Sequence, residues 1–140
     1  CFVSVLQHSS LTRMLENANE TTVYDRLVSF YREYLLYHWQ NPEMDFWNHV
    51  YYLPPESMKA EIIDVTGRSK DSLMEGLSDI LTEGVRTGEL QKLPVESMAM
   101  SFYYLLTCIS ISTDMMDKDE YLSNMDSCFA VYWNGIRAVK

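Results

Sequence analysis

The sequence is short of positive charge. It has 11 Lys and Arg residues against 20 Asp and Glu residues, which gives a net charge of −9 over 140 residues. The basic residues are scattered and form no run or stripe. Because an acidic surface repels phosphate backbones, we expect no nucleic-acid interface on this chain.

Cysteine and glycine are also scarce. The three cysteines, Cys1, Cys108 and Cys128, lie far apart without a Cys-x-x-Cys motif, which favours a reducing, cytoplasmic setting. We expect Cys108 and Cys128 to fill space on buried helices. The five glycines leave long stretches uninterrupted, as helices require.

The common catalytic motifs are missing. The chain contains no nucleophile elbow, no phosphate-binding glycine loop and no zinc-binding His-Glu-x-x-His. None of the histidines, His8, His38 and His49, follows a glutamate by three residues, so the di-iron Glu-x-x-His motif is absent too. We therefore expect a protein that is not an enzyme, with no catalytic residues, no metal and no cofactor.

Apolar residues recur every three to four positions, which predicts an all-α fold in a single domain over residues 1–140. We expect about six to seven helices, approximately over residues 2–17, 22–40, 42–53, 55–66, 69–87, 94–113 and 117–139. Gly67 is expected to end the fourth helix, and Gly88 to end the fifth in a left-handed conformation. Asp117 with Glu120 three residues later resembles a capping box at the start of the last helix.

No charged residue occurs from Ser97 to Thr113. Six hydroxyl side chains make this run too polar and too short for a membrane span, so we expect no membrane partner. The last helix has two adjoining apolar stripes. Both could simply be central helices of a single subunit. Because one small core does not easily cover two such broad helices, we expect a homodimer instead, in which both helices form a four-helix bundle with a second copy. The expected interface residues are Phe102, Ile109, Met125, Phe129, Tyr132, Trp133 and Ile136.

Ten of the 18 aromatic residues lie between Tyr24 and Tyr52. A core rich in rings is the simpler interpretation. A ligand cavity is the alternative, because buried tyrosine and tryptophan require partners for their polar atoms. His38 lies one turn after Tyr34 on the same stripe, and it is either a cavity residue or an ordinary core histidine.

The segment Glu83-Gly84-Val85-Arg86-Thr87-Gly88-Glu89-Leu90 resembles the recurrent helix end of TetR-type transcription regulators, Glu-Gly-x-x-x-Gly-Glu-hydrophobic. The stretch from Phe46-Trp47 to Pro54-Pro55 is similar to another recurring part of that family. A short link and two long apolar helices follow the first segment, as in the C-terminal regulatory domain of these proteins. As an order of helices, the resemblance covers nearly the whole chain.

The resemblance implies a ligand-controlled switch. A small hydrophobic or aromatic effector would occupy a cavity in each subunit, and residues 1–17 would carry the shift to a DNA-binding head. Family members begin with a basic helix-turn-helix, and Cys1 opens directly into an apolar pattern. We therefore expect an N-terminal part to be missing, and DNA to be a partner only through it. The residues expected to line the cavity are Phe30, Tyr34, His38, Trp47, Tyr51 and Tyr103.

Two other functions remain open. A helical module could bind a partner protein on its surface without an internal ligand, and a filled core with an exposed apolar groove would favour it. A small helical enzyme would need a buried carboxylate or histidine beside a nucleophile, and the sequence indicates no such set.

Overall fold

The computed structural model describes residues 22–139, without the side chains of residues 45, 47, 48, 51, 52, 65 and 69. The α-helices in this part of the chain are α2 (Val23–Gln40), α3 (Glu43–Tyr52), α4 (Lys59–Thr87), α5 (Val95–Ser110) and α6 (Lys118–Ile136). Two short 3-10 segments, Glu56–Met58 and Thr113–Met115, lie in the connections. The all-α prediction is confirmed, whereas the count of six to seven helices is not. The helix expected over residues 2–17 lies outside the described residues.

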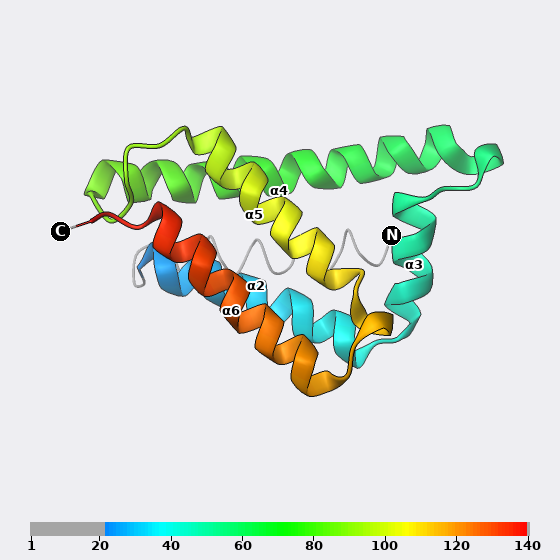
Figure 1. The fold of residues 1–140 in the computed structure, drawn as a ribbon. Coiled ribbons are helices and arrows are strands. Elements are labelled where there is room, and N and C mark those ends of the chain that lie inside the picture. The colour runs from blue at the N-terminus through cyan, green and yellow to red at the C-terminus, as the bar shows by residue number, and fades with distance from the viewer. Residues whose placement is uncertain (1–21, 140) are drawn as a thin grey trace.

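Helix α5 occupies the centre of the arrangement and contacts α2, α4 and α6. The long helix α4 runs along one side, and α2 and α6 lie together on the other (Figure 1). Helix α3 leads from the end of α2 back to α4 (Figure 1). The last two helices, α5 and α6, are therefore direct neighbours.

Two helix starts follow the local capping signals. Thr22 precedes α2, and its hydroxyl accepts the main-chain N–H of Asp25 at 3.1 Å. Asp117 precedes α6, and its carboxylate accepts the N–H of Glu120 at 2.9 Å. Such caps satisfy donors that have no partner inside the helix.

Helix α4 corrects the expected break at Gly67. Residues 59–87 form one helix of 29 residues, and its start at Lys59 follows a 3-10 turn instead of Pro55. The buried side chains of Ile62 and Leu73 are eleven residues apart, which is three helical turns, so one apolar face continues past Gly67. A glycine inside a helix costs only about 1 kcal/mol relative to alanine, and this face outweighs it. The helix ends at Gly88, whose φ of 82° is the expected left-handed conformation.

The core lies between α2, α4, α5 and α6 and is rich in rings. Tyr31 of α2 meets Phe102 of α5 at 6.1 Å and Phe129 of α6 at 5.0 Å between ring centroids. Leu77, Ile80 and Leu81 of α4 close the opposite side, fully buried. Of the two cysteines expected on buried helices, Cys108 is exposed, whereas Cys128 is partly buried and packs against this core.

Candidate functional site

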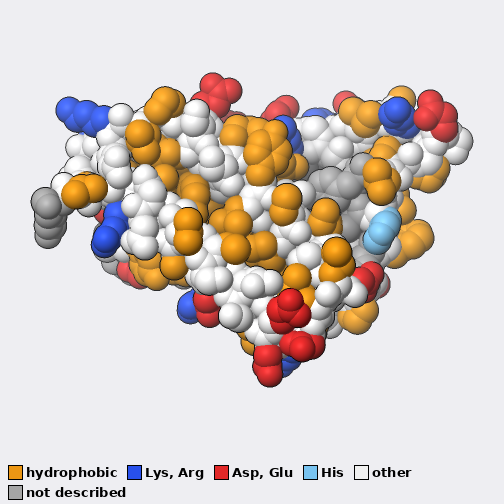
Figure 2. Space-filling model, viewed as in Figure 1, with side chains coloured by type: hydrophobic (Ala, Val, Ile, Leu, Met, Phe, Trp, Pro, Cys, Tyr) orange, Lys and Arg blue, Asp and Glu red, His pale blue; other side chains and the backbone are white. Residues whose placement is uncertain are grey.

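The outer surface of α5 and α6 carries no charge over most of its length. It consists of Ser97, Ser101, Tyr104, Leu105 and Cys108 on α5, Ile111 directly after α5, and Ser123, Ser127, Ala130, Val131, Asn134 and Gly135 on α6. We call these twelve residues the uncharged face. Figure 2 shows this side of the molecule as mostly apolar and uncharged polar side chains, with acidic groups gathered at the tip between α5 and α6. Asp126, the one charged residue from Tyr121 to Ile136, turns away and pairs with Arg32 of α2 at 3.1 Å.

An open groove of about 440 Å³ lies within this surface. Its walls come from Ser101 and Leu105 on α5 and from Ser127, Cys128, Val131 and Tyr132 on α6. Tyr132 donates its hydroxyl to the carbonyl of Met98 at 2.7 Å, so the polar end of this ring is already used inside the chain. Burial raises the pKa of that hydroxyl. The groove therefore offers small and apolar side chains with two serine hydroxyls.

Most of the residues expected at a dimer interface lie inside the single chain. Phe102, Ile109, Met125, Phe129 and Ile136 are buried. Trp133 is partly buried against Tyr24 of α2, with 5.0 Å between ring centroids, and Tyr132 borders the groove. The reason is that α2 covers the broad apolar face of α6. Helical periodicity marks an apolar stripe but does not show which neighbour covers it.

The sequence prediction does not include the outward residues, because they form no continuous apolar stripe. The exposed side chains of Tyr104, Ile111 and Val131 share this surface with small polar residues such as Ser101 and Ser127. The signal that identifies them is the absence of charge on exposed helix positions. In a chain with a net charge of −9, such positions are the ones expected to carry acidic groups.

The residues expected around an effector are brought together in part. Phe30, Tyr34 and His38 of α2 are buried, and their rings follow one another at centroid distances of 6.0 Å and 4.4 Å. His38 Nδ1 lies 2.9 Å from the carbonyl of Tyr34, and because a carbonyl only accepts, Nδ1 carries the proton.

Tyr103 lies on the side of α5 toward α4, where the ammonium of Lys70 is 5.2 Å from its ring centre. Trp47 and Tyr51 belong to α3, and their side chains lie outside the described part of the chain.

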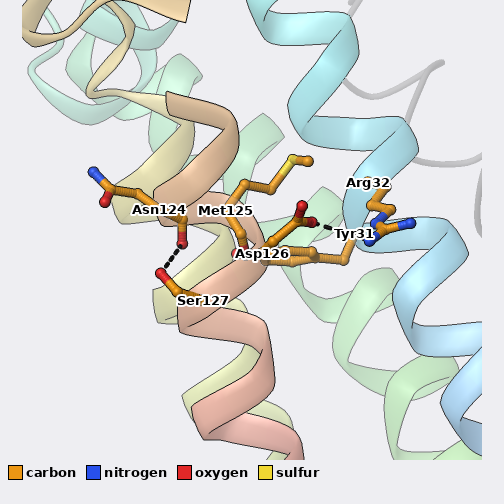
Figure 3. A network of polar contacts seen from close by, with 6 residues as sticks. All are labelled: Tyr31, Arg32, Asn124, Met125, Asp126 and Ser127. Atoms are coloured by element: carbon orange, nitrogen blue, oxygen red, sulfur yellow. Dashed lines mark hydrogen bonds and ion pairs between the residues drawn. The ribbon is translucent and has the colours of Figure 1, made fainter. Parts of the chain in front are cut away.

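Tyr31 and Tyr121, like Tyr132 above, use their hydroxyls to join helices. Tyr31 of α2 donates to the carbonyl of Met125 in α6 at 2.7 Å, and Tyr121 of α6 donates to the carbonyl of Leu35 in α2 at 2.9 Å. Figure 3 shows the first of these contacts beside the Arg32–Asp126 ion pair. Burial raises the pKa of Tyr31, and nearby Cys128, Tyr121 and Asp126 add to the shift. Main-chain carbonyls therefore accept the hydrogen bonds of these buried hydroxyls, as a filled core requires.

Residues 83–91, which include the segment that resembles the TetR-type motif, connect three helices. Glu89 accepts the N–H groups of Val23 at 3.1 Å and Tyr24 at 3.3 Å, so its carboxylate caps the start of α2. Gln91 donates from Nε2 to the carbonyls of Gly135 at 3.2 Å and Arg137 at 2.9 Å, at the end of α6. The end of α4 is thus tied to the start of α2 and the end of α6.

Gly84 and Gly88 make this arrangement sterically feasible. A Cβ atom on Gly84 would lie 2.7 Å from Cδ1 of Leu90 and 3.0 Å from Cγ2 of Val23. Leu90 also donates its N–H to the carbonyl of Gly84 at 3.0 Å, so the chain after α4 folds directly back onto the helix. The spacing of the two glycines therefore has a structural cause in this chain.

Arg26 is a buried cation next to this segment, with 7% of its surface exposed. Burial lowers the pKa of its guanidinium, and the carboxylates of Glu83 and Glu89 raise it. Glu83 in turn accepts from Nε of Arg86 at 2.9 Å, and this hydrogen bond lowers the pKa of Glu83. The two carboxylates offset part of the cost of burying Arg26.

The described residues include no group of three or more His, Cys, Asp or Glu side chains arranged to hold a metal ion. Between Thr22 and Val139, no helix combines the length and apolar character needed to cross a membrane. No protein-family model matches the chain, and a search of curated proteins finds no significant match either.

Proposed function

We propose that this chain is the dimerisation and effector-binding domain of a TetR-type transcription regulator. The resemblance of residues 83–90 and the order of the helices suggest the family. The uncharged face of α5 and α6 carries the dimerisation part of the proposal. In the family, such a domain controls a DNA-binding head, and we propose the same role for this chain.

Charge explains why a second copy is the partner that fits this face. Two molecules with a net charge of −9 repel each other, so the surfaces that meet should bring no further like charges into close contact. The uncharged face meets this condition along the exposed sides of two adjacent helices. A two-fold axis through it would bring four helices together, and a lasting dimer of this kind buries about 1,200–2,000 Å² or more.

Light scattering over a dilution series tests dimerisation. We expect a molar mass near twice 16.4 kDa that persists at micromolar concentration. Val131→Glu places a carboxylate on the uncharged face, and because Val131 is exposed, the fold of the single chain is unaffected. We expect this variant to be monomeric, whereas Ile63→Glu, at an exposed position on α4, stays dimeric. A wild-type monomer at these concentrations contradicts the proposal.

The effector site is proposed around the rings of Phe30, Tyr34 and His38, with Trp47, Tyr51 and Tyr103 as further lining residues. These side chains favour a flat, hydrophobic compound. A thermal-shift screen with indole, naphthalene and quinoline compounds tests this part, because a ligand at one hundred times its Kd stabilises the folded state by about 2.7 kcal/mol. Tyr103→Ala should reduce the shift, and Leu93→Ala, at an exposed site before α5, should not. The absence of any shift across such compounds contradicts an aromatic effector.

One observation favours the alternative function, a helical module that binds another protein. The groove between α5 and α6 is open, as a surface that receives part of another protein would be. A monomeric wild-type chain that binds none of the compounds would support this alternative.

A further inference from the structure

Tyr104 is the one aromatic residue of the uncharged face, and 56% of its surface is exposed. On α5 it follows Ser101 by three residues and directly precedes Leu105, and these two residues line the groove. Its ring meets the edge of the Tyr103 ring at 5.8 Å between centroids. Tyr103 is in turn held by Lys70 of α4. The orientation of this exposed ring is therefore supported from the side opposite to the groove.

The groove has the chemistry that a tyrosine ring needs. Leu105, Val131 and the ring of Tyr132 provide apolar contact, and Ser101, Ser127 and Cys128 leave space because they are small. Ser127 donates its hydroxyl to the carbonyl of Asn124 at 3.4 Å, and a hydroxyl that donates still has acceptor lone pairs. A phenol hydroxyl entering the groove thus finds an acceptor beside an apolar surface, as tyrosine prefers.

A protruding ring and a groove on the same face are a self-complementary pair. In a two-fold interface, each residue that one copy inserts is received by the same site of the other copy. We propose that Tyr104 of each copy inserts into the α5–α6 groove of the second copy. This inference rests on the proposed dimer and specifies its central contact. The second copy supplies one ring for each groove, and neither copy brings a charge into the interface.

Photo-crosslinking tests the contact directly. Tyr104 is replaced by p-benzoylphenylalanine, a larger aromatic residue whose benzophenone bonds covalently to a neighbour on irradiation. We expect a covalent dimer in which position 104 is joined to residues 127–132 of the other copy, as identified by mass spectrometry of the crosslinked peptides. A covalent dimer joined at any other segment overturns the insertion while leaving the dimer in place.

Dissociation measurements provide the second readout. Truncating a central interface aromatic costs about 2 kcal/mol or more, so Tyr104→Ala should raise the dimer Kd by about 30-fold or more. Tyr104→Phe keeps both rings and loses one hydrogen bond in each groove, so we expect a smaller rise than for Tyr104→Ala. Phe46→Ala is the matched control, because Phe46 is an aromatic residue with 63% exposure on α3, away from this face. An unchanged Kd for Tyr104→Ala overturns the insertion.

These outcomes separate this inference from the proposed function. A wild-type chain that is monomeric in light scattering removes the dimer, and the inference with it. A dimer that withstands Tyr104→Ala leaves the proposed function intact and removes only the contact. Circular dichroism of each variant shows that the helices are retained, as expected for a side chain on the surface.

Discussion

Val23, the first residue of α2, donates its main-chain N–H to the carboxylate of Glu89 over 3.1 Å, although 66 residues separate the two in the sequence. A helix start is usually capped from the preceding residues, and Thr22 does so here for Asp25. Glu89 adds a second cap from the link that follows the end of α4. The position of α2 is therefore fixed relative to the end of α4.

Removing this carboxylate should loosen the start of α2. We expect Glu89→Ala to lower the free energy of unfolding by about 1–2 kcal/mol, because two N–H groups lose a charged acceptor. Glu89→Gln keeps an acceptor without the charge and should lose about half as much. Urea unfolding followed by circular dichroism measures both. Glu75→Ala, at an exposed position of α4, should have little effect, and equal losses at positions 75 and 89 would contradict this role of Glu89.

Two glycines of α4 should respond to alanine in opposite directions. Gly84→Ala forces a Cβ atom against Leu90 and Val23 and should cost about 1–3 kcal/mol. Gly67→Ala meets no atom within 4 Å and should stabilise the helix by about 0.5–1 kcal/mol. The melting temperatures of the two variants give the comparison. A loss of stability in Gly67→Ala would show that the helix needs a glycine there for another reason.

Neighbouring positions on α2 should differ in what their contacts contribute. Tyr31→Phe removes the buried hydrogen bond to Met125 and should cost about 1 kcal/mol. Arg32→Ala breaks the ion pair with Asp126. The side chains of Arg32 and Asp126 are 54% and 55% exposed, so this loss should cost no more than about 0.5 kcal/mol. Chemical unfolding in 0.1 M and 1 M salt measures the difference, since only the ion pair should weaken in salt. A larger loss for Arg32→Ala would reverse this order.

Stability should fall at alkaline pH. Burial raises the pKa of Tyr31 and Tyr132 above the ordinary value of 10.0. Above about pH 10 the unfolded chain releases these protons while the folded chain retains them, so the free energy of unfolding decreases as the pH rises. Below the ordinary pKa both states are protonated, and this contribution is fully present.

Urea unfolding at pH 9 and pH 10.5 measures the alkaline loss, and absorbance at 295 nm follows tyrosine ionisation. In the double variant Tyr31→Phe and Tyr132→Phe, the dependence on pH should be weaker. Complete ionisation of all ten tyrosines near pH 10 in a chain that stays helical would contradict the prediction.

Signals confined to a few residues predicted the structure well. The cap at Asp117 and the left-handed Gly88 depend on local hydrogen bonding and backbone conformation, and the structure contains both. Gly67 was misjudged because a single glycine is a weak stop when the apolar face of the helix continues on both sides. Helix ends were thus predictable where a specific cap exists.

Contacts between distant helices were not predictable in the same way. The apolar stripes of α6 were recognised, but the sequence does not indicate that α2 covers Phe129 and Met125. The exposed side of α6 is marked only by missing charge, and the groove depends on how α5 and α6 lie together. The hydroxyl of Tyr31 likewise has its acceptor 94 residues away, beyond the reach of any local pattern.

The reciprocal contacts of Tyr31 and Tyr121 also constrain when the protein completes its fold during synthesis. The ribosome adds Tyr31 94 residues before Met125, and Leu35 86 residues before Tyr121. Helix α2 therefore leaves the ribosome without the helix that covers its aromatic side. Its final packing must wait until α6 has been translated, so the nascent chain presents a row of exposed rings until then.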